Sequence, residues 1–387
     1  MERDPAPHPK IIRLGERKDV GTRQVGNPDL AFVPTVAKVR HRKLPGRSEM
    51  DNFIKRYPFW SLIIIVLVAA FLWLVLAPWP PELAASWGRK QIFLNALLGG
   101  ITLGALYFLV ASGFTLIFGL MRIVNLAHGS LFLIGGYLGY EIATASGSWL
   151  LAFPIVFIVV GLIGLLMQFF IFSKMEGEEL RQTLVSIGLS IVFADLMLWW
   201  WGGQSYSILA PQFLQGPMEL PLVSNLNDST GAITWLRYPS VRVWILVAAI
   251  VIGVAMWLVL NRTALGMLIR AGVDDREMLA ASGVRIHLVF LAVFGFGAGL
   301  AGIAGIIGAT FQSLSPGEDT RFLLASLVVV IVGGMGSIVG AALGALIIGV
   351  AEQMGFVYAP TYSIVFTFLI MAAVLAFRPH GLLGMGR

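Results

Sequence analysis

Ten long runs of apolar residues divide this chain, and they limit what it can fold into more than any other feature. A helix needs about 17–25 mostly apolar residues to cross the roughly 30 Å hydrocarbon core of a bilayer. Only 12% of the 387 residues are charged, against about 25% in soluble domains. The sequence therefore predicts an all-α polytopic membrane protein with about ten transmembrane segments. The candidate spans are residues 59–77, 91–118, 126–145, 151–172, 184–201, 243–260, 286–311, 322–335, 338–355 and 362–377.

Two of these runs are expected to be irregular. The run 91–118 is long enough to tilt or to break, and the run 322–335 is short enough to be a half-spanning helix. Non-helical backbone at membrane depth must be buried in protein or line a cavity. The fold is therefore expected to include broken or half-spanning helices packed inside a bundle.

The net charge of +6 lies entirely in residues 1–57, which carry thirteen lysines and arginines against seven aspartates and glutamates. This stretch also has six prolines and no apolar periodicity, so we expect a disordered basic tail on the cytoplasmic side. As the role of this basic tail, we favour a topology signal or weak attraction to anionic lipid over nucleic-acid binding. The run 59–77 exceeds the ~7–15 apolar residues of a signal peptide, so residues 58–78 are predicted to be a retained transmembrane helix.

Counting spans from this tail assigns each loop to a side of the membrane. The segments around Arg122, 174–181 and 262–285 are then cytoplasmic, and ten spans return the C-terminus to the same side. Tryptophans at several outer borders, such as 199–201, agree with this orientation. The external loops are 78–90, 146–150, 202–242, 312–321 and 356–361.

Some classes of site are excluded by what the chain lacks. There is no cysteine, so disulfides, thiolate metal sites and cysteine nucleophiles are excluded. No Gly-x-x-x-x-Gly-Lys-Ser/Thr phosphate loop and no His-Glu-x-x-His pair occurs, so we expect no catalytic residue and no metal site. The 44 glycines are dense within 295–308 and 333–344, where small residues let helix backbones approach closely.

The polar segment 262–285, here called the handle, is the longest one between spans on the predicted inner side. Three acidic residues within 274–277 precede an apolar stretch that Gly283 ends. This pattern predicts a short amphipathic helix from about 273 to 282, with Ala271-Gly272 as a hinge ahead of it. Such a helix either gives a soluble partner a rigid grip on the spans or only covers the membrane surface.

Five motifs follow one another between residues 91 and 386. They are the glycine pattern from Asn95 to Gly113, Val124-Asn-Leu-Ala-His-Gly129, Arg270 with Leu279-Ala-Ala-Ser-Gly-Val284, Gly333-Gly-Met-Gly-Ser-Ile-Val-Gly340 and Arg378-Pro-His-Gly-Leu-Leu-Gly384. In this order they resemble the LivH-type permease subunit of branched-chain amino acid ABC transporters. The resemblance implies a permease core at 90–387, with a type II-like ABC importer fold and the handle as its coupling loop.

The resemblance also implies partners. These are two ABC ATP-binding subunits, a second permease of the LivM type or a second copy of this chain, and an extracytoplasmic solute-binding protein. The partner subunits would use ATP and Mg²⁺, and this chain would hold no cofactor. We expect a bacterial inner-membrane location, contact with membrane lipid, both termini in the cytoplasm and no nucleic-acid partner. The function implied is import of branched-chain amino acids, urea, short amides or aromatic acids by alternating access.

By position in the motifs, the resemblance assigns residues to three roles. Those expected to contact the ATPase are Arg270, Asp274, Glu277 and Gly283. Those expected in the translocation path or gate are Asn125, His128, Gly129, Gly334, Gly336 and Ser337. Glu318 and Asp319 fall in the predicted outer loop 312–321, where they either dock the binding protein or are simply solvated.

Asn125 and His128 stand at the predicted inner end of the third span, where polar groups are costly unless a cavity or a polar partner receives them. His128 is expected to donate one hydrogen bond to a carbonyl of a span. We favour a structural role, in which this pair caps and ties a broken helix near the inner gate, over direct contact with substrate.

The chain departs from the family in two places. Residues 1–77 lie outside the resemblance, and Ser130 follows the His-Gly pair where an acidic residue is common in amino-acid transporting members. A stand-alone ion-coupled carrier is the rival hypothesis. It would need Glu141 and Asp195 to face each other as coupling groups, and it would leave the handle without a role.

Overall fold

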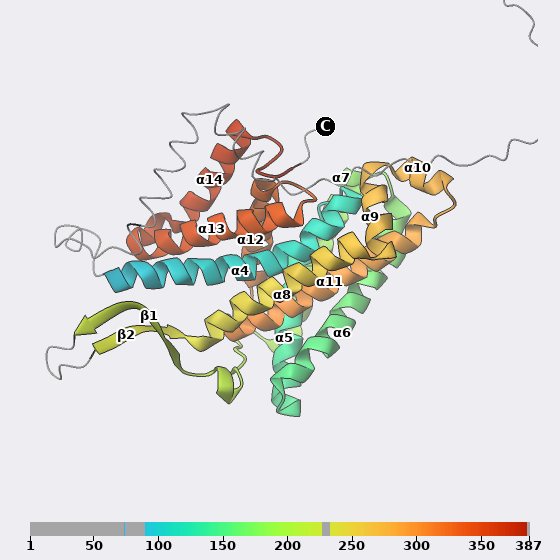
Figure 1. Ribbon diagram of the computed structural model, residues 1–387. Coiled ribbons are helices and arrows are strands. Elements are labelled where there is room, and N and C mark those ends of the chain that lie inside the picture. Colours follow the sequence, from blue (N-terminus) through green and yellow to red (C-terminus); the bar gives the residue numbers. More distant parts are fainter. Residues whose placement is uncertain (1–72, 74–89, 227–232, 385–387) are drawn as a thin grey trace, which may run out of the picture. The chain divides into compact units, whose positions relative to one another are not determined.

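The computed structural model describes residues 73, 90–226 and 233–384 (Figure 1). The predicted tail 1–57 lies outside the described residues, and so does the predicted extra span apart from Trp73. Each of the other nine predicted spans coincides with a helix. These helices are α4 (Lys90–Met121), α5 (His128–Ser146), α6 (Trp149–Phe170), α7 (Glu179–Trp201), α8 (Ser240–Arg262), α11 (Ile286–Phe311), α12 (Glu318–Gly333), α13 (Ile338–Tyr358) and α14 (Ser363–Phe377).

Within the described part, seven helices are long and apolar enough to cross a membrane, namely α4, α6, α7, α8, α11, α13 and α14. The prediction of an all-α polytopic membrane protein is confirmed. The 16-residue α12 matches the predicted half-span. The run expected to tilt or break forms one continuous helix, the 32-residue α4, which at 1.5 Å per residue is about 48 Å long.

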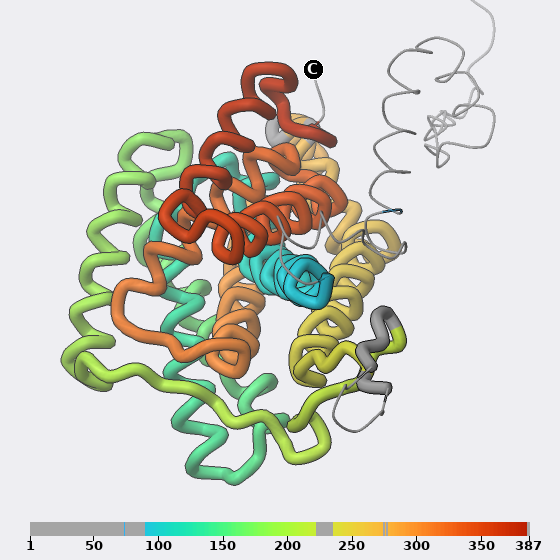
Figure 2. Tube along the Cα trace, turned by 90° about the vertical axis from the view of Figure 1, so that its left-hand side faces the viewer, coloured from blue at the N-terminus to red at the C-terminus, as the bar shows by residue number. Residues whose placement is uncertain are grey.

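Helix α4 lies at the centre of this bundle. Most of its side chains are buried, including Tyr107 and Phe114, and α8, α11, α12 and α13 pack around it. Figure 2 shows α4 (cyan) nearly end-on between α13 (red) and α8 (yellow). By contrast, α7 and α14 expose most of their apolar side chains. Because such surfaces are stable in lipid, the exposed helices mark the faces that meet the bilayer or another subunit.

Glycine pairs let the central helices touch backbone to backbone. A Cβ atom added at Gly349 of α13 would fall on the backbone of Gly104 in α4. A Cβ at Gly135 of α5 would likewise meet the backbone of Gly302 in α11. The close packing predicted from the glycine density is confirmed, because any larger residue at these crossings would separate the helices.

The segment 202–242, predicted from the sequence to be an external loop, contains a β-hairpin that was not predicted. Strands β1 (Pro217–Leu226) and β2 (Ile233–Pro239) pair antiparallel, with a register irregularity between Leu220 and Ser224. Tyr238 is buried, and its hydroxyl lies 2.8 Å from the hydroxyl of Thr102 in α4. This contact anchors the hairpin to the central helix.

Two further helices make up the handle. Helix α9 (Ala264–Asp274) follows α8 after Thr263, and α10 (Arg276–Ala281) follows α9 after Asp275. The sequence predicts a single helix with a hinge at Ala271-Gly272. The predicted position of the hinge is wrong, since both residues lie inside α9 and the two helices are separated at Asp275.

Candidate functional site

The segment 122–127 turns the chain back into the bundle after α4. Arg122 has a φ of 54°, the one positive value at a non-glycine among the described residues, and its N–H donates to the Phe118 carbonyl over 2.8 Å. After this turn, His128 Nε2 donates to the carbonyl of Val110 over 3.0 Å. The predicted hydrogen bond to a span carbonyl is therefore confirmed.

The structure places this pair beside the interior of the neighbouring helices, and its depth in the membrane stays a prediction. Val110 lies eleven residues before the end of α4 at Met121, which is roughly 16 Å along a helix. Ser130, two residues after His128, has its hydroxyl 3.4 Å from the carbonyl of Ser190, midway along α7. Helix α5 therefore begins beside the C-terminal half of α4 and the middle of α7.

Asn125 and His128 are fully buried. Asn125 Oδ1 accepts from the N–H of Ala127 over 3.1 Å, which supports the first turn of α5. The His128 ring packs edge-on against Phe114, with 5.5 Å between ring centroids. Among the described residues, Asn125 Nδ2 and His128 Nδ1 have no hydrogen-bond partner. These contacts support a structural role, and a place in the translocation path stays a prediction.

Helix α12 begins at the same level as α5. Ser130 Oγ donates to Asp319 Oδ2 over 3.4 Å, and Gly129 packs against the backbone of Asp319. Glu318 and Asp319 form the first turn of α12, so their predicted position in an outer loop is wrong. Asp319 is only 7% exposed. That Glu318 and Asp319 dock a solute-binding protein stays a prediction. The burial of Asp319 does not support it.

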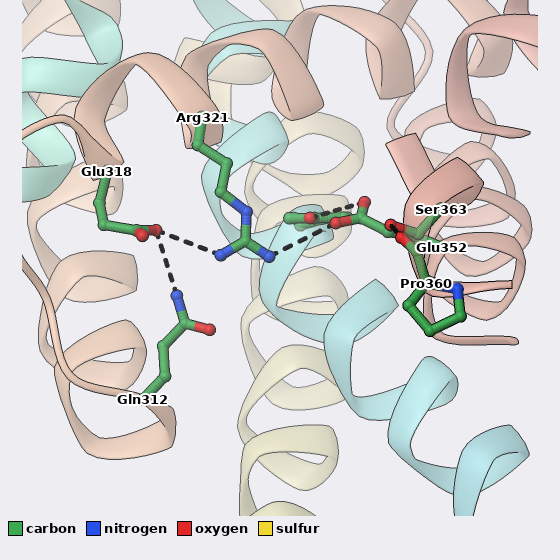
Figure 3. A network of polar contacts seen from close by, with 7 residues as sticks. Gln312, Glu318, Arg321, Glu352, Pro360 and Ser363 are labelled. Carbon is green, nitrogen blue, oxygen red and sulfur yellow. Dashed lines mark hydrogen bonds and ion pairs between the residues drawn. The ribbon is translucent and has the colours of Figure 1, made fainter. Parts of the chain in front are cut away.

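A charged cluster joins the first turn of α12 to α13 and α4. Figure 3 shows Arg321 between Glu318 and Glu352, with nitrogen–oxygen distances of 3.3 Å and 3.4 Å. Tyr107 of α4 donates to Glu352 Oε2 over 2.8 Å, and Gln312 donates to Glu318 over 3.3 Å. The Glu352 side chain is 14% exposed. Two carboxylates thus share one guanidinium where α4, α12 and α13 meet.

The sequence analysis did not assign Tyr107, Arg321 or Glu352 to a site. Helix α12 begins at Glu318, with Gly317 as its N-cap, four residues before the predicted span. With this start, the i,i+3 spacing of Glu318 and Arg321 would have predicted their ion pair. Nothing local to the sequence links Tyr107 to Glu352, because they are 245 residues apart.

The remaining predicted gate residues lie together at the turn between α12 and α13. Ser337 Oγ accepts from Gly340 N–H over 3.0 Å and caps α13, and Gly336 packs against Gly119 near the end of α4. The motif at 378–384 closes over this turn. Leu382 N–H donates to the Val332 carbonyl over 2.9 Å, and Leu383 N–H donates to the Gly333 carbonyl over 3.0 Å.

The handle is held by local capping. Thr263 Oγ1 accepts from Gly266 N–H over 3.1 Å at the start of α9, and Asp275 Oδ1 accepts from Met278 N–H over 3.0 Å at the start of α10. Gly283, with a φ of 85°, follows the end of α10. Of the other predicted coupling residues, Asp274 ends α9 and Glu277 lies in α10.

A cavity of about 340 Å³ lies where α9 of the handle meets α4, α8 and the start of α13. It brings predicted coupling and gate residues together, because Arg270 of α9 lines it together with Gly336 and Ser337. Asn125, His128 and Gly129 do not line this cavity. The predicted gate residues therefore form two groups, one at the start of α5 and one beside the handle.

The residues needed by the rival carrier hypothesis do not face each other. The indole N–H of Trp201 donates to Glu141 Oε1 over 3.1 Å, whereas Asp195 is exposed on the outer surface of α7. The geometry gives no support to a coupling pair formed by Glu141 and Asp195.

The chain is similar to permease proteins of known transport systems. A family model described as the branched-chain amino acid transport system / permease component matches residues 96–375. The permease protein BraD of the high-affinity branched-chain amino acid transport system of Pseudomonas aeruginosa is 28% identical, over 76% of this chain and 96% of that protein. The corresponding LivH protein of Escherichia coli K12 is 26% identical with the same coverage. The autoinducer 2 import system permease protein LsrC of Shigella flexneri is 26% identical over 66% of this chain and 70% of its own. No solved structure matches.

Proposed function

Because this chain belongs to the family of branched-chain amino acid transport system permease components, we propose that it is the permease subunit of an ATP-driven importer. Its cargo would be a branched-chain amino acid or a related small solute such as urea, a short amide or an aromatic acid. The observation that carries the proposal is the family match across 96–375, which covers α5 to α13 completely and most of α4 and α14.

The energy for transport would come from separate subunits. The chain has no phosphate-binding loop of the Gly-x-x-x-x-Gly-Lys-Ser/Thr type, so ATP and Mg²⁺ would be used by two ATP-binding partners. The handle supports this arrangement. It connects α8 to α11 through two capped helices and packs against α4 and α11, so a partner that grips it could move these spans as rigid bodies.

The complete assembly would contain a second permease, either a relative of the LivM type or another copy of this chain, and an extracytoplasmic solute-binding protein. It would lie in the bacterial inner membrane with both termini in the cytoplasm. Since an external binding protein would select the cargo, the fold supports the mechanism more strongly than it supports any one substrate.

Transport measurements on the purified assembly test this proposal. The chain is expected to co-purify with two ATP-binding subunits, and liposomes containing the assembly should accumulate solute only with ATP and the binding protein. The chain alone should not transport. Solute uptake by this chain alone, without any nucleotide, would establish a stand-alone carrier and overturn the proposal.

Reversing charges on the handle should uncouple the permease from its ATPase. Arg270→Glu and Asp274→Lys are each expected to weaken ATPase association while membrane insertion remains normal, because the contact surface changes sign. Pull-down of the ATPase measures the effect. Arg237→Glu, which breaks the exposed 3.5 Å pair with Glu219 on the hairpin, serves as the control. Normal pull-down with both handle variants would refute the assignment of the coupling residues.

A further inference from the structure

Two adjoining cavities form a groove along α4 between α8 and α13, and the two ends of this groove have different linings. One part, of about 410 Å³, is lined only by apolar residues, among them Phe108, Gly253 and Ala342. The other part is the cavity beside the handle, of about 340 Å³. Trp257, Ile338 and Val339 line both parts, so the two form one groove.

The end of the groove beside the handle is set up for an anion. Arg270 is the one ionisable residue among those that line it. None of the ion pairs between described residues involves Arg270. Among the described side chains that line this end, none is a carboxylate, so a phosphate group would meet the positive charge of Arg270.

Two neutral side chains at this end have hydrogen-bond donors left. Asn261 Nδ2 donates one hydrogen to the Trp257 carbonyl over 2.8 Å and keeps a second. Ser337 Oγ accepts from Gly340 N–H, which leaves its own proton for another acceptor. The groove therefore presents donors and a positive charge at one end and only hydrocarbon at the other.

We propose that this groove binds an anionic phospholipid from the leaflet on the side of the handle. The phosphate contacts Arg270, Asn261 and Ser337, and an acyl chain lies along α4 in the apolar part. A cationic pocket between membrane helices is the expected receptor for an anionic head group. Trp257, which lines the junction of the two parts, belongs to the residue type that favours the boundary between head groups and acyl chains.

This site has a mechanical consequence. Arg270 of α9 and Ser337 of the turn before α13 line the same cavity, and in the proposed site both contact the phosphate. The lipid therefore bridges the handle and the bundle. The proposed lipid site requires that the chain lies in a membrane, but it does not require transport. The lipid proposal can therefore be refuted while the proposed function holds, and the proposed function can be refuted while the lipid site holds.

Native mass spectrometry of the full-length chain in nanodiscs tests the site. The wild type should retain phosphatidylglycerol and release phosphatidylcholine. Arg270→Gln should weaken retention of phosphatidylglycerol about five- to tenfold, the effect expected for one basic residue near a lipid phosphate. The matched control is Arg262→Gln, an exposed arginine at the end of α8 that does not line the groove.

A second variant pair separates the apolar part from the charge. Ala342→Phe fills the groove and should also release the lipid, whereas Ala373→Phe on the exposed face of α14 should not. Equal retention of both lipids, or normal binding by Arg270→Gln and Ala342→Phe, would overturn the proposal. So would a groove variant that leaves lipid binding intact but blocks association with a second permease, because a protein would then be the occupant.

Discussion

Replacing Gly349 with alanine is expected to lower the free energy of unfolding by about 2–3 kcal/mol, even though alanine is the better helix former. The added Cβ atom would fall on the backbone of Gly104 and lie 2.7 Å from the Gly100 carbonyl oxygen. Backbone atoms cannot move aside as a flexible side chain can. The crossing of α4 and α13 must therefore widen, and the contacts around the central helix are lost.

Gly188 provides the matched control. It lies in α7, also within a membrane helix, but a Cβ added there meets nothing within 4 Å. Gly188→Ala should therefore leave stability unchanged or raise it by about 0.4–1 kcal/mol through the reduced entropy of the unfolded chain. Unfolding of both purified variants, followed by circular dichroism in the same detergent, measures the difference. Equal stability of the two variants would show that the crossing is not tightly packed.

Replacing Arg321 with methionine should destabilise the protein by about 1–3 kcal/mol. The change leaves Glu318 and Glu352 without their shared cation. Breaking a fully buried ion pair costs about 3–5 kcal/mol, and this figure is reduced because the Arg321 side chain is 45% exposed and partly screened by solvent. The hydrogen bond from Tyr107 to Glu352 does not supply the missing charge.

The pair formed by Arg181 and Glu178 is the comparison for this effect. Its members are also three residues apart, at 3.1 Å, but their side chains are 60% and 55% exposed. Arg181→Met should therefore change stability by about 0–1 kcal/mol. In the Arg321→Met background, adding Glu318→Gln and Glu352→Gln should recover most of the loss, because the unpaired charges are then removed. The prediction would be wrong if Arg321→Met and Arg181→Met lowered the free energy of unfolding equally and the two glutamine substitutions restored none of it. The cluster around Arg321 would then contribute no more to stability than a surface ion pair.

The transmembrane helices were predictable because hydrophobicity directly determines which segments cross a bilayer. The side and depth of particular residues were less predictable. Counting spans assumes that every apolar run crosses completely, yet α5 begins beside Val110, eleven residues before the end of α4, and α12 has only 16 residues. For this reason Asn125 and His128 were placed at an inner end, and Glu318 and Asp319 in an outer loop.

Other errors left a signal in the sequence. Thr263 stands before an apolar run, which is typical of a helix N-cap, so α9 could have been predicted. The run Ile233-Thr-Trp-Leu-Arg-Tyr238 is rich in β-branched and aromatic residues, as expected of a strand. The contact between Tyr107 and Glu352 and the cavity at Arg270 depend on tertiary packing, which no local pattern encodes.

The contact between the motif at 378–384 and the end of α12 also bears on biosynthesis. The carbonyls of Val332 and Gly333 receive their hydrogen bonds from residues about fifty positions further along the chain. A ribosome adds roughly 5–20 residues each second, so these two hydrogen bonds form seconds after α12 has been made. The nascent chain therefore completes this part of the bundle only after Leu382 and Leu383 have been made and have reached α12.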